Sequence, residues 1–377
     1  MHSKGKSKRM RKNQLISVMI SLTFGTLVTG CGASETRTDN SSDAISAISE
    51  TYAEESSLSN ATLVTGDTTD EVTNDDQELA DIIATYGVNI EVNHSATKGI
   101  YPYVLRTESV NMFLAADDIE KLGKDEFFNG LKDISDLMEQ DFAEARQVLA
   151  PYISGDIPAV DVITDFCNHD SYSSFFGAYY SVGHIKCFYD WNATKTSLLH
   201  EYIHYLTLCC ADTKATDEFM KEGIAEYISM LRCENRMARS INYMLSEKAI
   251  QNYIDHGACT SDGKSIDYVK RYYCDAQLFV EGYEVGRQYS TVSIGNTIAT
   301  RTEEMQNNPN KSNASYPEAA CIISYLVETY SEEAVLGNMG MSATNFEDIF
   351  GKSYPEIYKD WAEWNTQKCD ELGITIE

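Results

Sequence analysis

The chain has 377 residues, of which 43% are hydrophobic and 23% are charged, a mixture typical of globular proteins and not of disordered chains. It carries 30 lysines and arginines against 58 acidic residues, a formal charge of −28. Six of those basic residues lie within the first twelve positions, so the remainder has 24 basic against 58 acidic residues, or −34. Such an acidic surface repels phosphate backbones, and we expect no nucleic-acid partner.

The first 30 residues have the order of a secretory signal peptide. A basic stretch over 1–12 precedes a mostly apolar run from Leu15 to Gly30. As a helix this run would be about 24 Å long, which is short of a hydrocarbon core of about 30 Å. The run continues into Cys31 as Leu-Val-Thr-Gly-Cys, which resembles the lipobox of bacterial lipoproteins. The resemblance implies lipidation of Cys31 and an extracytoplasmic protein anchored to the cell membrane. Ordinary secretion or an uncleaved anchor is the alternative.

The remaining chain divides by composition. Residues 31–78 are expected to form a disordered acidic tether, because Ser, Thr, Asp, Glu and Asn dominate and large apolar residues are few. We expect an α-rich leader over 79–155, a main domain over 156–367 and a tail over 368–377. In the leader, seven apolar residues at spacings of three and four predict one buried helical face: Phe127, Leu131, Ile134, Met138, Phe142, Ala145 and Leu149.

In the main domain, short strands are expected at 160–163 and 183–189, the second of them at the edge of a sheet. Helical patterning dominates from Thr196 onward and returns over 316–330. The tyrosine-rich stretch 235–312 supports no assignment. Nine cysteines follow Cys31, an odd number without any CxxC pair, which disfavours a cysteine zinc site. Adjacent Cys209 and Cys210 are interpreted as helix-packing residues.

The sequence His-Glu-Tyr-Ile-His over 200–204 lies inside a helical pattern. His200 and His204 are one turn apart on the same face, so both imidazoles can reach one metal ion. Glu201 is rotated by about 100° from His200, within reach of a water molecule on that metal. Hydrolysis at zinc requires a third protein ligand and one open position.

Glu222, eighteen residues after His204, is the candidate for that third ligand. The first helix can extend about seven residues beyond His204, and polar residues 212–216 can form a turn. A helix returning from Asp217 would then bring Glu222 opposite the two histidines. Glu226, one turn further on, can accept a hydrogen bond from a ligand histidine. The alternative is a pair of histidines at the edge of the core and a solvated glutamate.

The pattern HExxH followed by Glu-Gly-Ile-Ala-Glu-Tyr over 222–227 resembles the gluzincin metallopeptidases, particularly the peptidase MA-like group and more distantly the M1 aminopeptidases. The resemblance covers about 155–367 and is strongest over 196–230. It implies an α+β fold that is mostly α. A zincin-like domain with a small mixed sheet and an HExxH helix would be followed by an α-helical C-terminal part.

The same resemblance implies that His200, His204 and Glu222 bind Zn²⁺ and that Glu201 is the general base. The M1 sequence GAMEN is not present and Lys221 stands where M1 enzymes commonly have Asn, so aminopeptidase activity does not carry over. The strand over 183–189 is expected where gluzincins bind the substrate backbone.

A second resemblance begins at Tyr316, which precedes a helix of small and apolar residues as in the downstream gluzincin block. It implies that the Tyr316 hydroxyl binds the oxyanion of the reaction. Tyr316 as a packing residue is the alternative, and Tyr283 and His256 are rival candidates. His184 is interpreted as structural.

These observations together predict a lipid-anchored, extracytoplasmic zinc metallopeptidase with a peptide or protein substrate. One alternative is a catalytically weak zinc-fold lipoprotein for binding or surface maintenance. Another is a zinc hydrolase acting on a non-peptide substrate. The sequence predicts neither the cleavage specificity nor the oligomeric state.

Overall fold

The computed structural model describes residues 74–167, 178–181, 183–210, 218–241, 247–263, 265–280, 291–293, 313–341 and 345–376. The signal peptide, Cys31 and almost all of the expected tether lie outside these residues. The first part of the fold runs in the order α2 (Asn74–Tyr86), β1 (Ile90–Val92), β2 (Tyr103–Arg106), β3 (Val110–Leu114), α3 (Ala116–Leu122), α4 (Lys124–Leu149), the 3₁₀ turn η1 (Ala150–Tyr152), β4 (Val160–Thr164), β5 (Ala178–Ser181) and β6 (His184–Cys187).

These six strands form one mixed sheet in the order β1-β2-β3-β4-β6-β5. The pairs β1–β2 and β2–β3 are antiparallel, β3–β4 and β4–β6 are parallel, and β5 lies antiparallel to β6. The expected strands over 160–163 and 183–189 are confirmed as β4 and β6. The region expected to be an α-rich leader contributes β1–β3, so the sheet continues across the expected boundary at 155/156.

The placement of the edge strand differs from the prediction. The strand expected at the edge, β6, lies between β4 and β5, and the edge belongs to β5. The chain reverses tightly at Gly183, whose φ of 90° suits glycine, so that Ser181 pairs with His184 and β5 folds back along β6. His184 is therefore buried on an inner strand and not on the edge.

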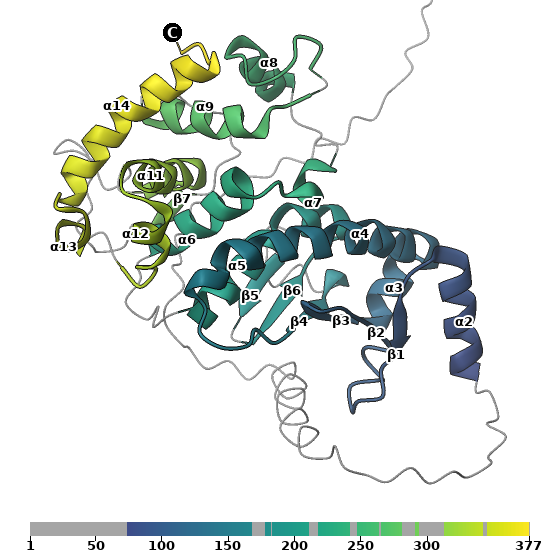
Figure 1. Ribbon diagram of the computed structural model, residues 1–377. Helices are drawn as coiled ribbons and strands as arrows, with labels where there is room; N and C mark the ends of the chain where they lie inside the picture. Colours follow the sequence, from purple (N-terminus) through teal and green to yellow (C-terminus); the bar gives the residue numbers. More distant parts are fainter. Residues whose placement is uncertain are drawn as a thin grey trace, which may run out of the picture. The chain divides into compact units, whose positions relative to one another are not determined.

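Helix α4 packs along α5 (Trp191–Cys210), and the two helices lie side by side over the sheet (Figure 1). All seven residues of the predicted α4 stripe are buried, which confirms that helical face. The Phe142 ring stacks on the Tyr202 ring with centroids 3.7 Å apart and planes 1° from parallel. Trp191 donates its indole N–H to the Phe127 carbonyl at 2.8 Å and so attaches the start of α5 to α4.

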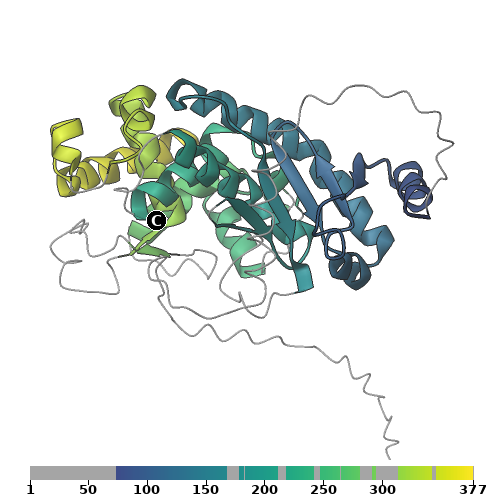
Figure 2. The same ribbon diagram turned by 90° about the horizontal axis from the view of Figure 1, so that it is seen from below.

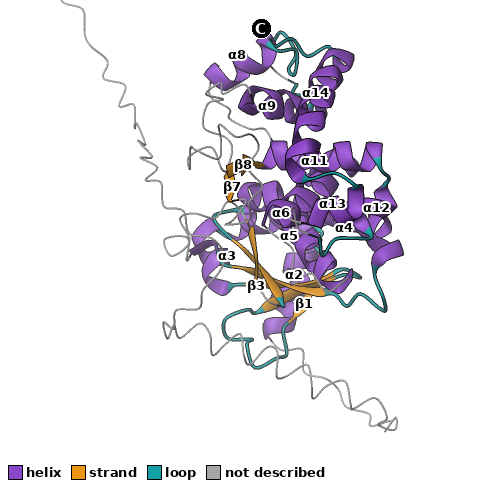
Figure 3. Cartoon of the chain, turned by 90° about the vertical axis from the view of Figure 1, so that its left-hand side faces the viewer, coloured by secondary structure: helices purple, strands orange, loops and turns teal. Residues whose placement is uncertain are grey.

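The second part of the described chain is almost wholly helical, which confirms the α+β, mostly α class and the helical C-terminal part. Its elements are α6 (Glu218–Glu226), the π-helical η4 (Tyr227–Arg232), α7 (Arg236–Arg239), α8 (Glu247–Asp255), α9 (Tyr268–Val280), β7 (Thr291–Ser293), β8 (Asn313–Ser315), α11 (Tyr316–Thr329), α12 (Glu332–Leu336), α13 (Phe346–Phe350) and α14 (Tyr354–Leu372). Among the strands that the structure describes, β7 and β8 pair with each other and lie apart from the main sheet (Figure 3).

Helix α11 is the centre of this part, because it packs against α6, α9 and α14. Helix α14 continues to Leu372, beyond the expected domain end at 367, because Cys369 is buried and the helix stops only at Gly373, whose φ is 69°. The C-terminal helices and α2 lie at opposite ends of the fold (Figures 1 and 2). Among the described residues no helix has both the length and the apolarity needed to cross a membrane.

Candidate metal centre

Helix α5 places two histidines on one face. His200 and His204 are separated by one helical turn, and both side chains are nearly buried, with residue exposures of 8% and 6%. Their ring centroids are 4.6 Å apart and their planes are nearly perpendicular, at 88°. The surrounding positions of α5 hold buried apolar residues such as Leu199 and Ile203, so packing keeps this face of the helix in place.

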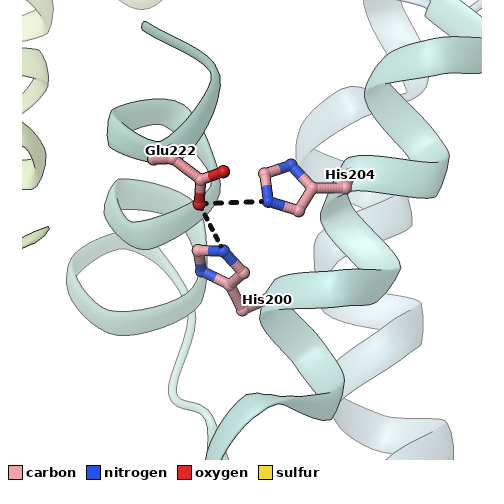
Figure 4. A group of neighbouring side chains, drawn as sticks. All are labelled: His200, His204 and Glu222. Atoms are coloured by element: carbon pink, nitrogen blue, oxygen red, sulfur yellow. Dashed lines mark hydrogen bonds and ion pairs between the residues drawn. The ribbon is translucent and has the colours of Figure 1, made fainter. Parts of the chain in front are cut away.

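Helix α6 brings Glu222 to the same point. Helix α5 ends at Cys210 and α6 begins at Glu218. These bounds are close to the predicted ones, a turn over 212–216 and a second helix from Asp217. Glu222 Oε2 lies 3.0 Å from His200 Nε2 and 3.3 Å from His204 Nε2, with the three side chains converging from the two helices (Figure 4). Residues 211–217, between the helices, lie outside the described part.

The three donor atoms lie close enough together to hold one metal ion. All three lie within 4.8 Å of one another. Two ligand atoms that are each about 2.0–2.2 Å from a tetrahedral ion are separated by about 3.3–3.6 Å, and the distances from Glu222 Oε2 to the two histidines are 3.0 and 3.3 Å. Two imidazoles and one carboxylate form a donor set that zinc commonly takes in hydrolytic sites. The residues present therefore fit the ion.

The charges in the cluster are strongly coupled. Burial lowers the pKa of His200, but its contacts with Glu222 and Glu226 outweigh burial and raise that pKa well above 6.5. Burial raises the pKa of Glu222, yet the nearby His204 and His200 bring it well below 4.5. Both shifts favour the charged forms of the two groups, so His200 and Glu222 attract each other as an ion pair.

Glu201 points from α5 toward the edge of the sheet. Its Oε2 accepts a hydrogen bond of 2.8 Å from the backbone N–H of Tyr180 on β5. Burial raises the pKa of Glu201, and the two histidines of the cluster partly oppose that shift. Glu201 is thus a half-buried carboxyl group beside the cluster that is not one of its three donors.

Tyr316 lies close to the cluster as the first residue of α11. Its ring centroid is 5.9 Å from that of His200, with the planes at 78°, and the side chain is half-buried. The rival His256 lies at the end of α8, where its Nδ1 is 2.7 Å from the carbonyl oxygen of Asn252. The other rival, Tyr283, lies outside the described residues. Lys221 Nζ is 4.0 Å from Glu222 Oε1.

Glu226 lies beside His200, as the sequence predicts, but their contact is an ion-pair contact and not the expected hydrogen bond, and Glu226 makes a second contact that the sequence does not predict. Glu226 Oε1 lies 3.3 Å from His200 Nδ1, on the opposite side of the ring from Glu222. Glu226 Oε2 accepts a hydrogen bond of 2.6 Å from the Tyr272 hydroxyl on α9. Among 24 tyrosines, many of them in the unassigned stretch 235–312, nothing in the sequence distinguishes Tyr272.

Comparison with protein-family models, with curated proteins and with solved structures finds no match for this chain. The interpretation of the cluster therefore depends on its geometry and on the resemblance of its short motifs.

Proposed function

We propose that the protein is a zinc-dependent metallopeptidase with a zincin-like domain, anchored outside the cytoplasm through lipidated Cys31. The observation that carries the proposal is the convergence of His200 Nε2, His204 Nε2 and Glu222 Oε2, close enough together to hold one metal ion. Glu201, next to His200 on α5, supplies a carboxyl group beside that site without occupying a ligand position.

A zinc ion held by these three residues would lower the pKa of water toward about 7 and polarise a carbonyl group. Glu201 would accept the proton of the attacking water and later deliver it to the leaving amine. Burial raises the pKa of Glu201, which is the direction of shift that helps a carboxyl group to take up and release a proton in turn. Tyr316, half-buried beside His200, would donate a hydrogen bond from its hydroxyl group to the oxyanion.

Strand β5 is the place where a peptide could be held. It is the edge of the sheet, so its outer side offers backbone groups for an added strand. It also contacts α5 and holds Glu201 through the Tyr180 N–H. A peptide added along β5 would therefore lie next to Glu201, and we propose a peptide or protein substrate for that reason.

The test is zinc content by elemental analysis of the purified protein, with peptide-library digestion as the second measurement. We expect about one zinc per chain in the wild type and a clear loss in Glu222→Ala, which removes one of three protein ligands. Glu201→Gln is the matched variant, because it keeps the ligands and the side-chain size. It should retain zinc and lose hydrolysis.

Three results would contradict the proposal at different levels. A folded wild-type protein without zinc would refute the metal site. Zinc binding with every peptide left intact would favour a binding lipoprotein or a hydrolase of non-peptide substrates. Hydrolysis that persists in Glu201→Gln would refute the role of Glu201.

A further inference from the structure

Helix α9 contacts Glu226, beside the cluster of His200, His204 and Glu222, through the side chain of Tyr272. Tyr272 is nearly buried, with 8% exposure, and its hydroxyl donates to Glu226 Oε2 at 2.6 Å from 46 positions away in the chain. The short distance is typical of a hydroxyl donating to a charged carboxylate. Helix α9 itself packs against α11 and α14, so the backbone that carries the Tyr272 hydroxyl is fixed by two neighbouring helices.

The two oxygens of Glu226 have different partners. Oε2 receives the Tyr272 hydroxyl, and Oε1 lies 3.3 Å from His200 Nδ1. A carboxylate oxygen near Nδ1 favours the tautomer with hydrogen on Nδ1, which leaves the lone pair on Nε2. His200 Nε2 is the atom that faces Glu222, so this tautomer is the one that can bind a metal there.

Glu226 needs an external support for this task. It is the last residue of α6, and the π-helical η4 follows it directly, so the regular α-helical backbone ends at this side chain. A glutamate has three rotatable side-chain bonds and loses considerable conformational freedom when held in one position. The bond from Tyr272 restricts that freedom from outside the α5–α6 pair.

We propose that Tyr272 is a positioning residue of the metal site, which orients Glu226 so that Glu226 in turn fixes the ring and tautomer of His200. The inference depends on the proposed function, because it assumes that the cluster binds zinc. It makes α9, which belongs to neither motif, a functional part of the site.

The chain offers a matched control in the next residue. Tyr273 is also nearly buried on α9, with 4% exposure, but its hydroxyl lies 2.9 Å from Ser324 Oγ instead of Glu226. Tyr272→Phe and Tyr273→Phe each remove one hydroxyl and one hydrogen bond from the same helix. Any general effect on stability should therefore be similar in the two variants, whereas an effect on the metal should be confined to Tyr272.

The experiment measures zinc affinity by competition with a chelator, and the visible absorption spectrum of the Co²⁺-substituted protein, for the full chain. We expect Tyr272→Phe to weaken zinc binding about tenfold, the lower end of the range for residues that support a ligand, and to change the Co²⁺ spectrum. Tyr273→Phe should leave both unchanged. In a Glu226→Ala background, Tyr272→Phe should have no further effect, because the side chain through which it acts is gone.

The inference fails if Tyr272→Phe binds zinc like the wild type while Glu226→Ala does not, or if both tyrosine variants weaken zinc equally. It also fails if the effects of Tyr272→Phe and Glu226→Ala simply add. A wild-type protein without zinc refutes the proposed function as well, which separates the two failures. If Tyr272→Phe does not fold, Tyr272→Met, which also lacks the donor and adapts to irregular space, is judged by the same criteria.

Discussion

Substituting Gly223 by alanine should show how closely the metal site depends on helix packing. Gly223 follows Glu222 directly in α6, on the side that packs against α11. A Cβ atom there would lie 3.2 Å from the Ala319 carbonyl oxygen and from Ile323 Cγ1, and 3.3 Å from Ala319 Cβ. Two of these three atoms belong to the backbone or to a Cβ of α11 and cannot rotate away, so α6 itself must move by a few tenths of an ångström.

The expected loss of stability is the difference between two effects. Alanine is more favourable than glycine in a helix interior by about 1 kcal/mol. Overpacking a filled interface costs about 1–3 kcal/mol. Gly223→Ala should therefore lower the free energy of unfolding by about 0–2 kcal/mol. The displacement also moves Glu222 in a site where ligand atoms must be held within about 0.5 Å, so zinc affinity should fall about three- to tenfold.

The measurements are urea unfolding of the metal-free protein and competition with a zinc chelator. Gly130→Ala in α4 is the control, because its Cβ would lie 2.1 Å from Trp191 Cδ1 at the far end of α5. It should lower stability more than Gly223→Ala and leave the zinc affinity of the folded protein unchanged. A Gly223→Ala protein that is more stable than wild type and binds zinc equally well would refute this reasoning.

Four other predictions concern the same fold. The raised pKa of His200 means that zinc must displace a proton at pH 7, so zinc affinity measured by chelator competition should rise about tenfold per pH unit for each proton displaced. The stability of the metal-free protein should change with pH in the opposite direction. The stabilisation from the raised pKa of His200 is complete below about pH 6.5 and is lost as the pH rises through the folded-state pKa, which unfolding at several pH values should show. Phe142→Ala should cost about 3–5 kcal/mol in chemical denaturation, because it removes a fully buried ring stacked on Tyr202, and a cost under about 1 kcal/mol would contradict that view. Asp141→Asn should cost about 2 kcal/mol, because the buried carboxylate accepts hydrogen bonds from the backbone and guanidinium of Arg236, and thermal unfolding unchanged from wild type would contradict it.

The parts of the site that could be predicted are those fixed by local rules. Histidines four residues apart on a helix share a face, whatever the rest of the fold does. A short polar stretch between two helical patterns favours an antiparallel pair, and this is enough to bring Glu222 opposite His200. The buried face of α4 could be predicted for the same reason, because the spacing of its apolar residues along the helix is enough to indicate which face is buried.

What could not be predicted depends on pairing between distant segments. Strands β1–β3 have only three to five residues each, and runs this short carry little periodicity. The order of strands in the sheet depends on which strands pair with each other. Strand β6 pairs with β4 on one side and with β5 on the other, so the edge strand is β5, which the sequence analysis does not predict. Helix α14 continues past the expected domain end at 367 for a similar reason, since Cys369 is buried against the fold and the helix runs to Leu372.

The candidate site also combines features that depend on local sequence with features that depend on distant segments. The donors of the cluster come from one local helix pair, but the two nearby carboxylates of Glu201 and Glu226 each accept a hydrogen bond from a distant element. Glu201 Oε2 accepts from the Tyr180 N–H on β5, and Glu226 Oε2 accepts from the Tyr272 hydroxyl on α9. Each bond fixes one oxygen of its carboxylate, and the roles proposed above, proton transfer for Glu201 and orientation of the histidine for Glu226, depend on the side-chain orientation that results. A short motif can therefore predict which residues form the cluster, while contacts with β5 and α9 determine the orientation of the two carboxylates beside it.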